Sequence, residues 1–200
     1  MTIKEIKVGK SLVYRVCFEG ENEEDNEIMR KIENFADRSA KNTYKRSRMV
    51  NDEHRKNIVI GKMAEYAFSE LTYKYTGIRM KPSFENRVDV FDFNISGLKI
   101  DIKSSSMTTK RRIYNLSQAL SSFNFTVLAD QSFKDVIIQV LYPSREEYFC
   151  FYFSVWQYVK NVIQANNRRR IKMNGGYGDY FLFPLTEGYP LLELFKMMRR

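Results

Sequence analysis

The sequence predicts an α/β fold in which helices cover both faces of a central mixed β-sheet, a three-layer α/β/α sandwich. Two nearly continuous apolar runs, residues 135–142 and 148–153, are typical of strands buried on both faces. Apolar residues recur at helical spacing over residues 27–45 and 52–75. No linker rich in Pro, Gly or Ser interrupts the chain, so we expect one domain over residues 1–200.

The first two strands are expected at residues 3–8 and 12–18, around the turn Gly9-Lys10-Ser11, as an edge hairpin. An acidic loop then leads into the helix over 27–45. The negative charges of this loop favour the start of the helix through the helix dipole. Asp52 is the predicted cap of the second helix.

The second helix runs to about Tyr75 and carries a broad apolar face, with Glu65 at its edge. Gly77 ends this helix. This position leaves two orientations open for Glu65, into the protein or toward solvent, and helix statistics alone favour solvent.

The stretch 87–106 predicts an antiparallel hairpin. Its first half is β-branched and aromatic, its second half alternates apolar and charged residues, and the turn residues 94–97 separate them. Acids stand in both halves, and a lysine follows the second acid by two positions. We therefore place the chemistry of the protein on this hairpin.

The length of the hairpin loop determines which acids meet. We prefer a three-residue loop with a bulge, which pairs Asn94 with Leu98 and puts Asp89 on the face of Asp101. A two-residue loop would instead bring Asp92 to face Asp101.

The second half of the chain is expected to begin with a hydroxyl-rich loop over 104–109 and a helix around 116–123. Ser154 is the expected cap of a helix over 155–165, in which Trp156 is a packing residue. After this helix we expect a loop that contains Arg168-Arg169-Arg170 and then Gly175-Gly176-Tyr177-Gly178. A short strand at 180–184 and a helix at 191–198 are the last expected elements.

The chain carries 33 Lys and Arg against 24 Asp and Glu, a net charge of +9, which favours a polyanionic partner, nucleic acid first. The only cysteines are Cys17 and Cys150 and the only histidine is His54, so a Cys/His zinc site is not expected. The two cysteines leave a disulfide open without requiring one. With no signal core and no apolar run long enough for a membrane span, we expect a cytoplasmic protein that does not bind membranes.

Acidic and basic residues in a particular order indicate the chemistry of the protein. Gly61-Lys62-Met63-Ala64-Glu65 on a helix, Asp89 on a strand and Asp101-Ile102-Lys103 closing a hairpin, followed by serines, resemble the PD-(D/E)xK nuclease superfamily. The pattern looks most like small type II restriction endonucleases. Val88 stands where the family's name has proline.

The resemblance implies a restriction-endonuclease-like core over about 52–155, with 1–46 and 156–200 as additions. It further implies that Asp89, Asp101 and the carbonyl of Ile102 bind Mg²⁺ or Mn²⁺ and that Lys103 serves the attacking water. Glu65 would help to bind or orient the metal, and Asp92 is the alternative ligand.

The implied activity is Mg²⁺-dependent endonucleolytic hydrolysis of double-stranded DNA by a homodimer. A structure-specific nuclease such as a Holliday junction resolvase and a non-catalytic nucleic-acid-binding accessory subunit are the alternatives. The expected DNA contacts are the serines after the hairpin and two basic clusters: Ser104, Ser105, Ser106, Lys110, Arg111, Arg112, Arg168, Arg169 and Arg170.

Overall fold

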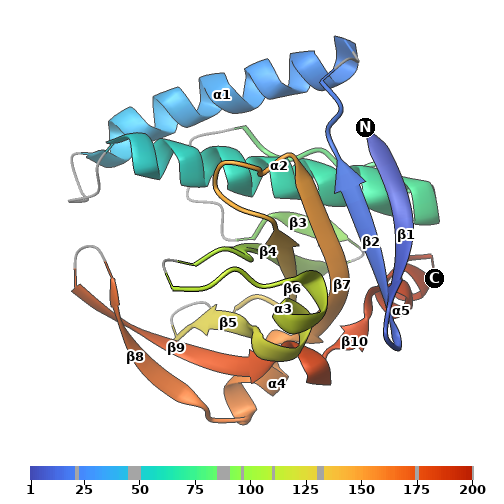
Figure 1. The fold of residues 1–200 in the computed structure, drawn as a ribbon, viewed down its shortest axis with the longest axis vertical. Coiled ribbons are helices and arrows are strands. Elements are labelled where there is room, and N and C mark those ends of the chain that lie inside the picture. Colours follow the sequence, from blue (N-terminus) through green and yellow to red (C-terminus); the bar gives the residue numbers. More distant parts are fainter. Residues whose placement is uncertain are drawn as a thin grey trace.

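The computed structural model describes residues 1–20, 23–44, 51–84, 91–95, 97–109, 111–129, 133–173 and 176–199. It is an α/β fold with a mixed sheet, as the sequence predicts (Figure 1). The elements, in chain order, are β1 (Thr2–Val8), β2 (Ser11–Cys17), α1 (Glu23–Tyr44), α2 (Asn51–Thr76), β3 (Phe93–Ile95), β4 (Leu98–Ser106), α3 (Leu116–Ser122), β5 (Asn124–Leu128), β6 (Val136–Tyr142), β7 (Cys150–Tyr158), α4 (Val159–Gln164), β8 (Arg168–Met173), β9 (Gly176–Pro184), the short 3₁₀ helix η2 (Leu185–Glu187), β10 (Tyr189–Pro190) and α5 (Leu191–Met198).

The main sheet has the strand order β1-β2-β7-β6-β4-β3, with β10 beside β7. β4 and β6 run parallel, and the other neighbouring strands of this sheet within the described residues run antiparallel. β6 is central, and all seven of its residues are buried, which explains its continuous apolar sequence. The pairing brings the start of β6 next to the strand that carries Asp101.

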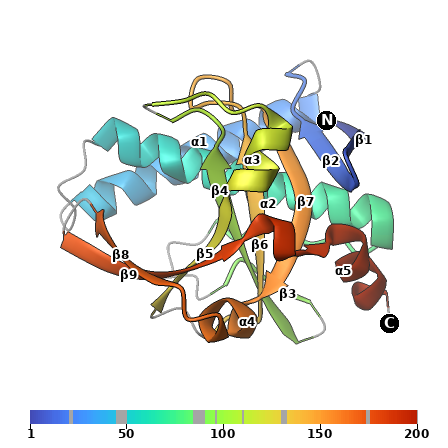
Figure 2. The same cartoon turned by 60° about the horizontal axis from the view of Figure 1, so that its bottom comes forward.

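The two faces of the main sheet are covered differently. One face packs against α2 and α5, with α1 lying alongside α2, and buries alternate residues of β6 such as Val136, Ile138 and Val140 (Figure 1). The opposite face buries Ile137 and Leu141 against α3, β5, α4 and η2. Here β5 belongs to a second antiparallel sheet, β5-β9-β8, so strands as well as helices cover this face (Figure 2).

Several expected boundaries are wrong. α1 begins at Glu23 and not at Glu27, because acids expected in the preceding loop form its first turn. The segment around Trp156 continues β7 to Tyr158 because its alternate side chains are buried against the sheet, so the helix begins only at Val159. β4 extends through Ser106, which makes the three serines strand residues that pair with β6. Residues 168–173 form β8, paired with β9, where a loop was expected, and β5 was not predicted.

The expected helix limits hold more closely. α2 ends at Thr76, and Gly77 follows with a positive φ of 75° while its N–H donates to the carbonyl of Tyr73. α5 has the predicted bounds. Within the part of the chain described above, no helix has both the length and the apolar character required to span a membrane.

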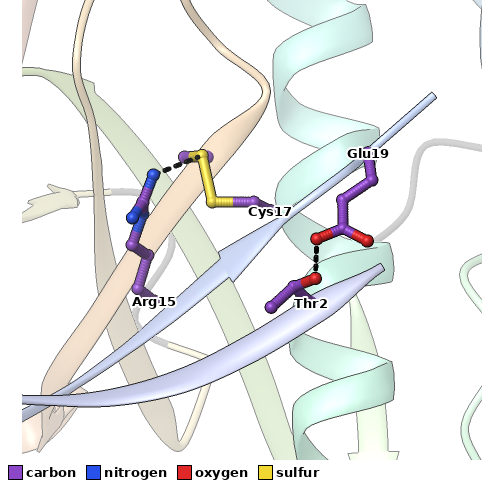
Figure 3. The surroundings of a disulfide bond; sticks show 5 residues. Thr2, Arg15, Cys17 and Glu19 are labelled. Carbon is purple, nitrogen blue, oxygen red and sulfur yellow. Dashed lines mark hydrogen bonds between the residues drawn. A yellow bond between two sulfur atoms is a disulfide. The ribbon is translucent and has the colours of Figure 1, made fainter. Parts of the chain in front are cut away.

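A disulfide joins Cys17 of β2 to Cys150 of β7, two residues that lie directly opposite each other in the antiparallel pair (Figure 3). The side chain of Arg15 reaches the sulfur of Cys150 at 3.5 Å. Disulfides persist mainly in oxidising compartments, so this bond weighs against the cytoplasmic expectation, which stays a prediction.

Reduction of this disulfide is expected to lower the free energy of unfolding by about 4 kcal/mol, because the bond closes a loop across 133 positions of sequence and so restricts the unfolded chain. Urea unfolding with and without dithiothreitol measures the change. The Cys17→Ser protein is the control, and its stability should not respond to dithiothreitol. Equal stability of the oxidised and reduced wild-type protein would contradict the expectation.

Candidate active site

The loop of the central hairpin has two residues. β3 and β4 pair Phe93 with Ile100 and Ile95 with Leu98, so only positions 96 and 97 lie between the last paired residues. Gly97 adopts a positive φ of 86°, which a tight hairpin turn requires and glycine permits without strain. The preferred three-residue loop is therefore wrong, and the alternative with two residues is correct.

This register places Asp92 opposite Asp101. The N–H of Asp92 donates to the carbonyl of Ile100 at 2.9 Å, and its Oδ2 accepts from the N–H of Ile102 at 2.6 Å. With a loop of two residues, Asp92 is the acid expected to face Asp101, as the alternative register predicts. Asp89 lies outside the described residues.

Asp101 is buried, with 3% of its surface exposed, and two lysines neutralise it. Lys103, two positions along the same strand, places Nζ 2.9 Å from Oδ2 and 3.3 Å from Oδ1. Lys134, just before β6, contacts Oδ1 and is itself only 6% exposed. Both oxygens of this carboxylate therefore have an ammonium partner.

The carboxyl group of Asp92 has a pKa raised to about 6. The largest cause is burial, which disfavours the charged form, and the second is the nearby negative charge of Asp101. The hydrogen bond from Ile102 and the positive charges of Lys103 and Lys62 act in the opposite direction. These causes are those expected for a buried carboxyl group that lies near a second carboxylate.

Glu65 lies inside the protein, with 7% of its surface exposed, and not in solvent as helix statistics alone would favour. It binds Lys62, one turn earlier on α2, through an ion pair of 2.7 Å. The charge of Lys62 in turn lowers the pKa of Asp92, so α2 acts on the hairpin through this lysine. Among the described residues, no three acidic, histidine or cysteine side chains come close enough to hold a metal ion together, and Glu65 is not a third ligand in this conformation.

The donor set of the hairpin nevertheless fits a hard divalent cation. Asp92 and Asp101 supply carboxylate oxygens, which Mg²⁺ and Mn²⁺ prefer. The N–H of Ile102 points to Asp92, and since the N–H and C=O of one strand residue point to the same side, its carbonyl faces that side too. A cation there would relieve the repulsion that raises the pKa of Asp92.

A buried glutamine fixes the strand beyond Lys103. Nε2 of Gln139 donates to the carbonyl of Lys103 and to Oγ of Ser105, each at 3.0 Å. Gln139 and Lys134 both belong to the β6 segment and were not expected as site residues. The sequence contained a hint of their role, because a buried polar residue within or just before a continuous apolar strand needs a hydrogen-bond partner on the neighbouring strand.

The serines after Lys103 line a cleft of about 750 Å³ at the end of β4. Asn57 and Glu53 of α2 form one side, and Glu53 binds Arg145 at 2.7 Å. The other lining residues are mostly hydroxyl-bearing or aromatic: Ser104, Ser105, Ser106, Thr108, Thr109, Phe123 and Tyr142, with Ile60. The cleft thus continues from the strand that carries Asp101.

The structure places the expected basic contacts on separate elements. Arg111 and Arg112 are exposed in the turn before α3, and the Arg112 guanidinium lies 4.8 Å from the centre of the Tyr114 ring. Arg168 and Arg169 are exposed on β8, where Arg168 binds Asp179 at 2.5 Å. Lys110 lies outside the described residues, as does the side chain of Arg170.

Comparison of the chain with protein-family models, with curated proteins and with solved structures finds no match in any of the three.

Proposed function

We propose that the protein is a Mg²⁺-dependent endodeoxyribonuclease of the PD-(D/E)xK type, similar to type II restriction endonucleases. The observation that carries the proposal is the closeness of two acids at the hairpin: Asp92 accepts from the N–H of Ile102, the residue after Asp101, and Lys103 contacts Asp101. Two facing carboxylates followed by a lysine two positions later are the parts that metal-assisted phosphodiester hydrolysis requires.

In this proposal Asp92, Asp101 and the Ile102 carbonyl hold the cation. A bound Mg²⁺ lowers the pKa of a water molecule and withdraws charge from the phosphoryl oxygens. Lys103 has a side chain that is 33% exposed, so its ammonium group can reach a substrate phosphate, orient the attacking water and stabilise the negative charge that develops in the transition state. Lys62 pairs with Glu65 on α2, so Glu65 is not assigned as a metal ligand.

The substrate is proposed to be double-stranded DNA. The net charge of +9 favours a polyanion, and the hydroxyl groups of the cleft at the end of β4 can donate to phosphate oxygens. Exposed arginines on β8 and before α3 would contact the phosphate backbone of the DNA outside the cleft. A homodimer would place one such site on each strand of the duplex, so the dimer belongs to the proposal.

Replacement of Lys103 by methionine is expected to slow plasmid cleavage in Mg²⁺ by about 100-fold or more, because the side chain keeps its length but loses the charge that stabilises the transition state. Agarose gels of supercoiled plasmid measure the rate, and discrete bands would indicate sequence specificity. Lys196→Met is the matched control, since Lys196 lies on the exposed surface of α5 and pairs with Glu193. Wild-type-like cleavage by Lys103→Met would contradict the proposed role.

A nucleic-acid-binding accessory subunit is the second candidate. It is favoured by the neutralisation of Asp101 by Lys103 and Lys134, which gives the carboxylate a complete set of partners without a metal ion. Calorimetric titration with Mg²⁺ separates the two, because an accessory subunit would bind DNA without binding Mg²⁺ at the hairpin. A structure-specific nuclease would cut branched DNA and leave linear duplexes intact.

A further inference from the structure

Lys134 has no role in the reaction described above, yet it is the more deeply buried of the two lysines that contact Asp101. Its side chain is 5% exposed and that of Asp101 is 4% exposed. The burial of two charged groups costs free energy, and their mutual attraction offsets this cost only when the geometry of the ion pair is favourable. A second lysine in contact with an acid that Lys103 already neutralises therefore needs a reason beyond charge balance.

The backbone at Lys134 is fixed against the hairpin strand. The N–H of Asp135 donates to the carbonyl of Lys99 at 2.9 Å, and Oδ2 of Asp135 accepts from the N–H of Lys99 at 2.8 Å. The carbonyl of Asp135 also accepts from the N–H of Val159 at 3.0 Å. The lysine thus directly precedes a residue held by three hydrogen bonds, and its side chain, only 5% exposed, is enclosed beside Asp101.

The two lysines differ in their access to solvent. The side chain of Lys103 is 33% exposed, whereas that of Lys134 is almost fully enclosed. An incoming cation would displace the accessible ammonium group from Oδ2 of Asp101 and leave the enclosed one on Oδ1. Lys103 would then be released toward the substrate phosphate at the moment when the cation binds.

We propose that Lys134 is a positioning residue that remains bound to Oδ1 of Asp101, directs Oδ2 toward the cation and, through its positive charge, weakens the hold of the site on that cation. This inference rests on the proposed function, because it assumes the metal site on the hairpin. It assigns a role to a residue outside the hairpin and outside the acid-x-lysine motif.

The test is the Mg²⁺ affinity of the Lys134→Met protein, measured by calorimetry without DNA, together with the shift in melting temperature that Mg²⁺ produces. We expect about tenfold tighter Mg²⁺ binding and a larger Mg²⁺-induced shift than in the wild type, since one positive charge near the cation is removed. DNA cleavage is expected to be slower despite the tighter binding, because Asp101 loses its orientation. Lys160→Met, at an exposed position of α4, is the control and should leave both quantities unchanged.

If the ion pair were purely structural, its loss in Lys134→Met would lower the melting temperature of the metal-free protein and leave the Mg²⁺ affinity unchanged. That result would overturn the inference. Lys134→Gln, which retains a donor for Oδ1, serves if the methionine variant does not fold, and the same gain in affinity is expected. Tighter Mg²⁺ binding by the variants with no cleavage by any protein supports the inference and rejects the nuclease. Cleavage by the wild type with unchanged Mg²⁺ affinity in the variants supports the nuclease and rejects the inference.

Discussion

The Asp101→Asn protein is expected to cleave plasmid DNA in Mg²⁺ at least about 1000-fold more slowly than the wild type. Asp101 supplies the carboxylate that Lys103 contacts at 2.9 Å and, in the proposed site, a charged oxygen to the cation. The amide has no negative charge, so it binds a hard cation weakly and the bound water keeps a high pKa. Rates of plasmid cleavage and the affinity for Mg²⁺ are the measurements.

Asparagine is a better replacement than alanine at this position. Alanine would leave Lys134 buried without its partner, and breaking a buried pair on one side costs about 3 to 5 kcal/mol. The amide oxygen of asparagine still accepts a hydrogen bond from Lys134, so loss of cleavage can be assigned to the site and not to unfolding. Asp37→Asn, which removes an exposed partner of Arg55, is the matched control and should cleave like the wild type. Rapid cleavage by a folded Asp101→Asn protein would refute the nuclease.

Replacement of Asp92 by asparagine is expected to stabilise the metal-free protein at pH 8 while cleavage is lost. The pKa of Asp92 is raised from 3.8 to about 6 in the folded protein, so the folded state binds its proton more tightly than the unfolded state. The stability therefore falls as the pH rises from about 4 to about 6, and stays lower above that. The loss amounts to about 3 kcal/mol, and the neutral amide avoids most of it.

Urea unfolding of the wild type and of Asp92→Asn at pH 4 and pH 8, both with EDTA, measures this difference. The two proteins should be about equally stable at pH 4, and the variant should be more stable by about 2 kcal/mol at pH 8. Other titrating groups act in both proteins and cancel in the comparison. Addition of Mg²⁺ at pH 8 should stabilise only the wild type. A variant that is less stable than the wild type at pH 8 would show that the carboxylates do not repel each other as described.

The gain in stability and the loss of activity have the same cause. Burial and the nearby charge of Asp101 raise the pKa of Asp92, and in the proposed site a cation between the two acids would favour the charged form of Asp92. Active sites often contain such unfavourable charge arrangements, because the same groups that destabilise the free protein bind the cofactor. This relation makes the pH profile of stability informative about function even when the DNA target is unknown.

Periodicity and turn chemistry predicted the long elements well. The buried strand β6, the helix α2 with Gly77 at its end, and the last helix α5 follow from local patterns that the tertiary structure does not override. The segment after Ser154 was different, because its apolar residues suit either a helix or a buried strand, and only packing against the main sheet favours the strand to Tyr158. The β8–β9 pair also escaped prediction, since its Arg- and Gly-rich sequence resembles a loop.

The sequence by itself identified the acid-x-lysine of Asp101 and Lys103 and the helix acid Glu65. It left Asp89 and Asp92 as alternatives for the acid before them and preferred Asp89. The tertiary structure decided how they meet. A loop of two residues makes Asp92 the acid that faces Asp101, because a change of one residue in register moves every side chain to the other face of the strand. Parallel pairing of β4 with β6 brings in Lys134, which local sequence could not reveal because its partner lies 33 positions away in the chain.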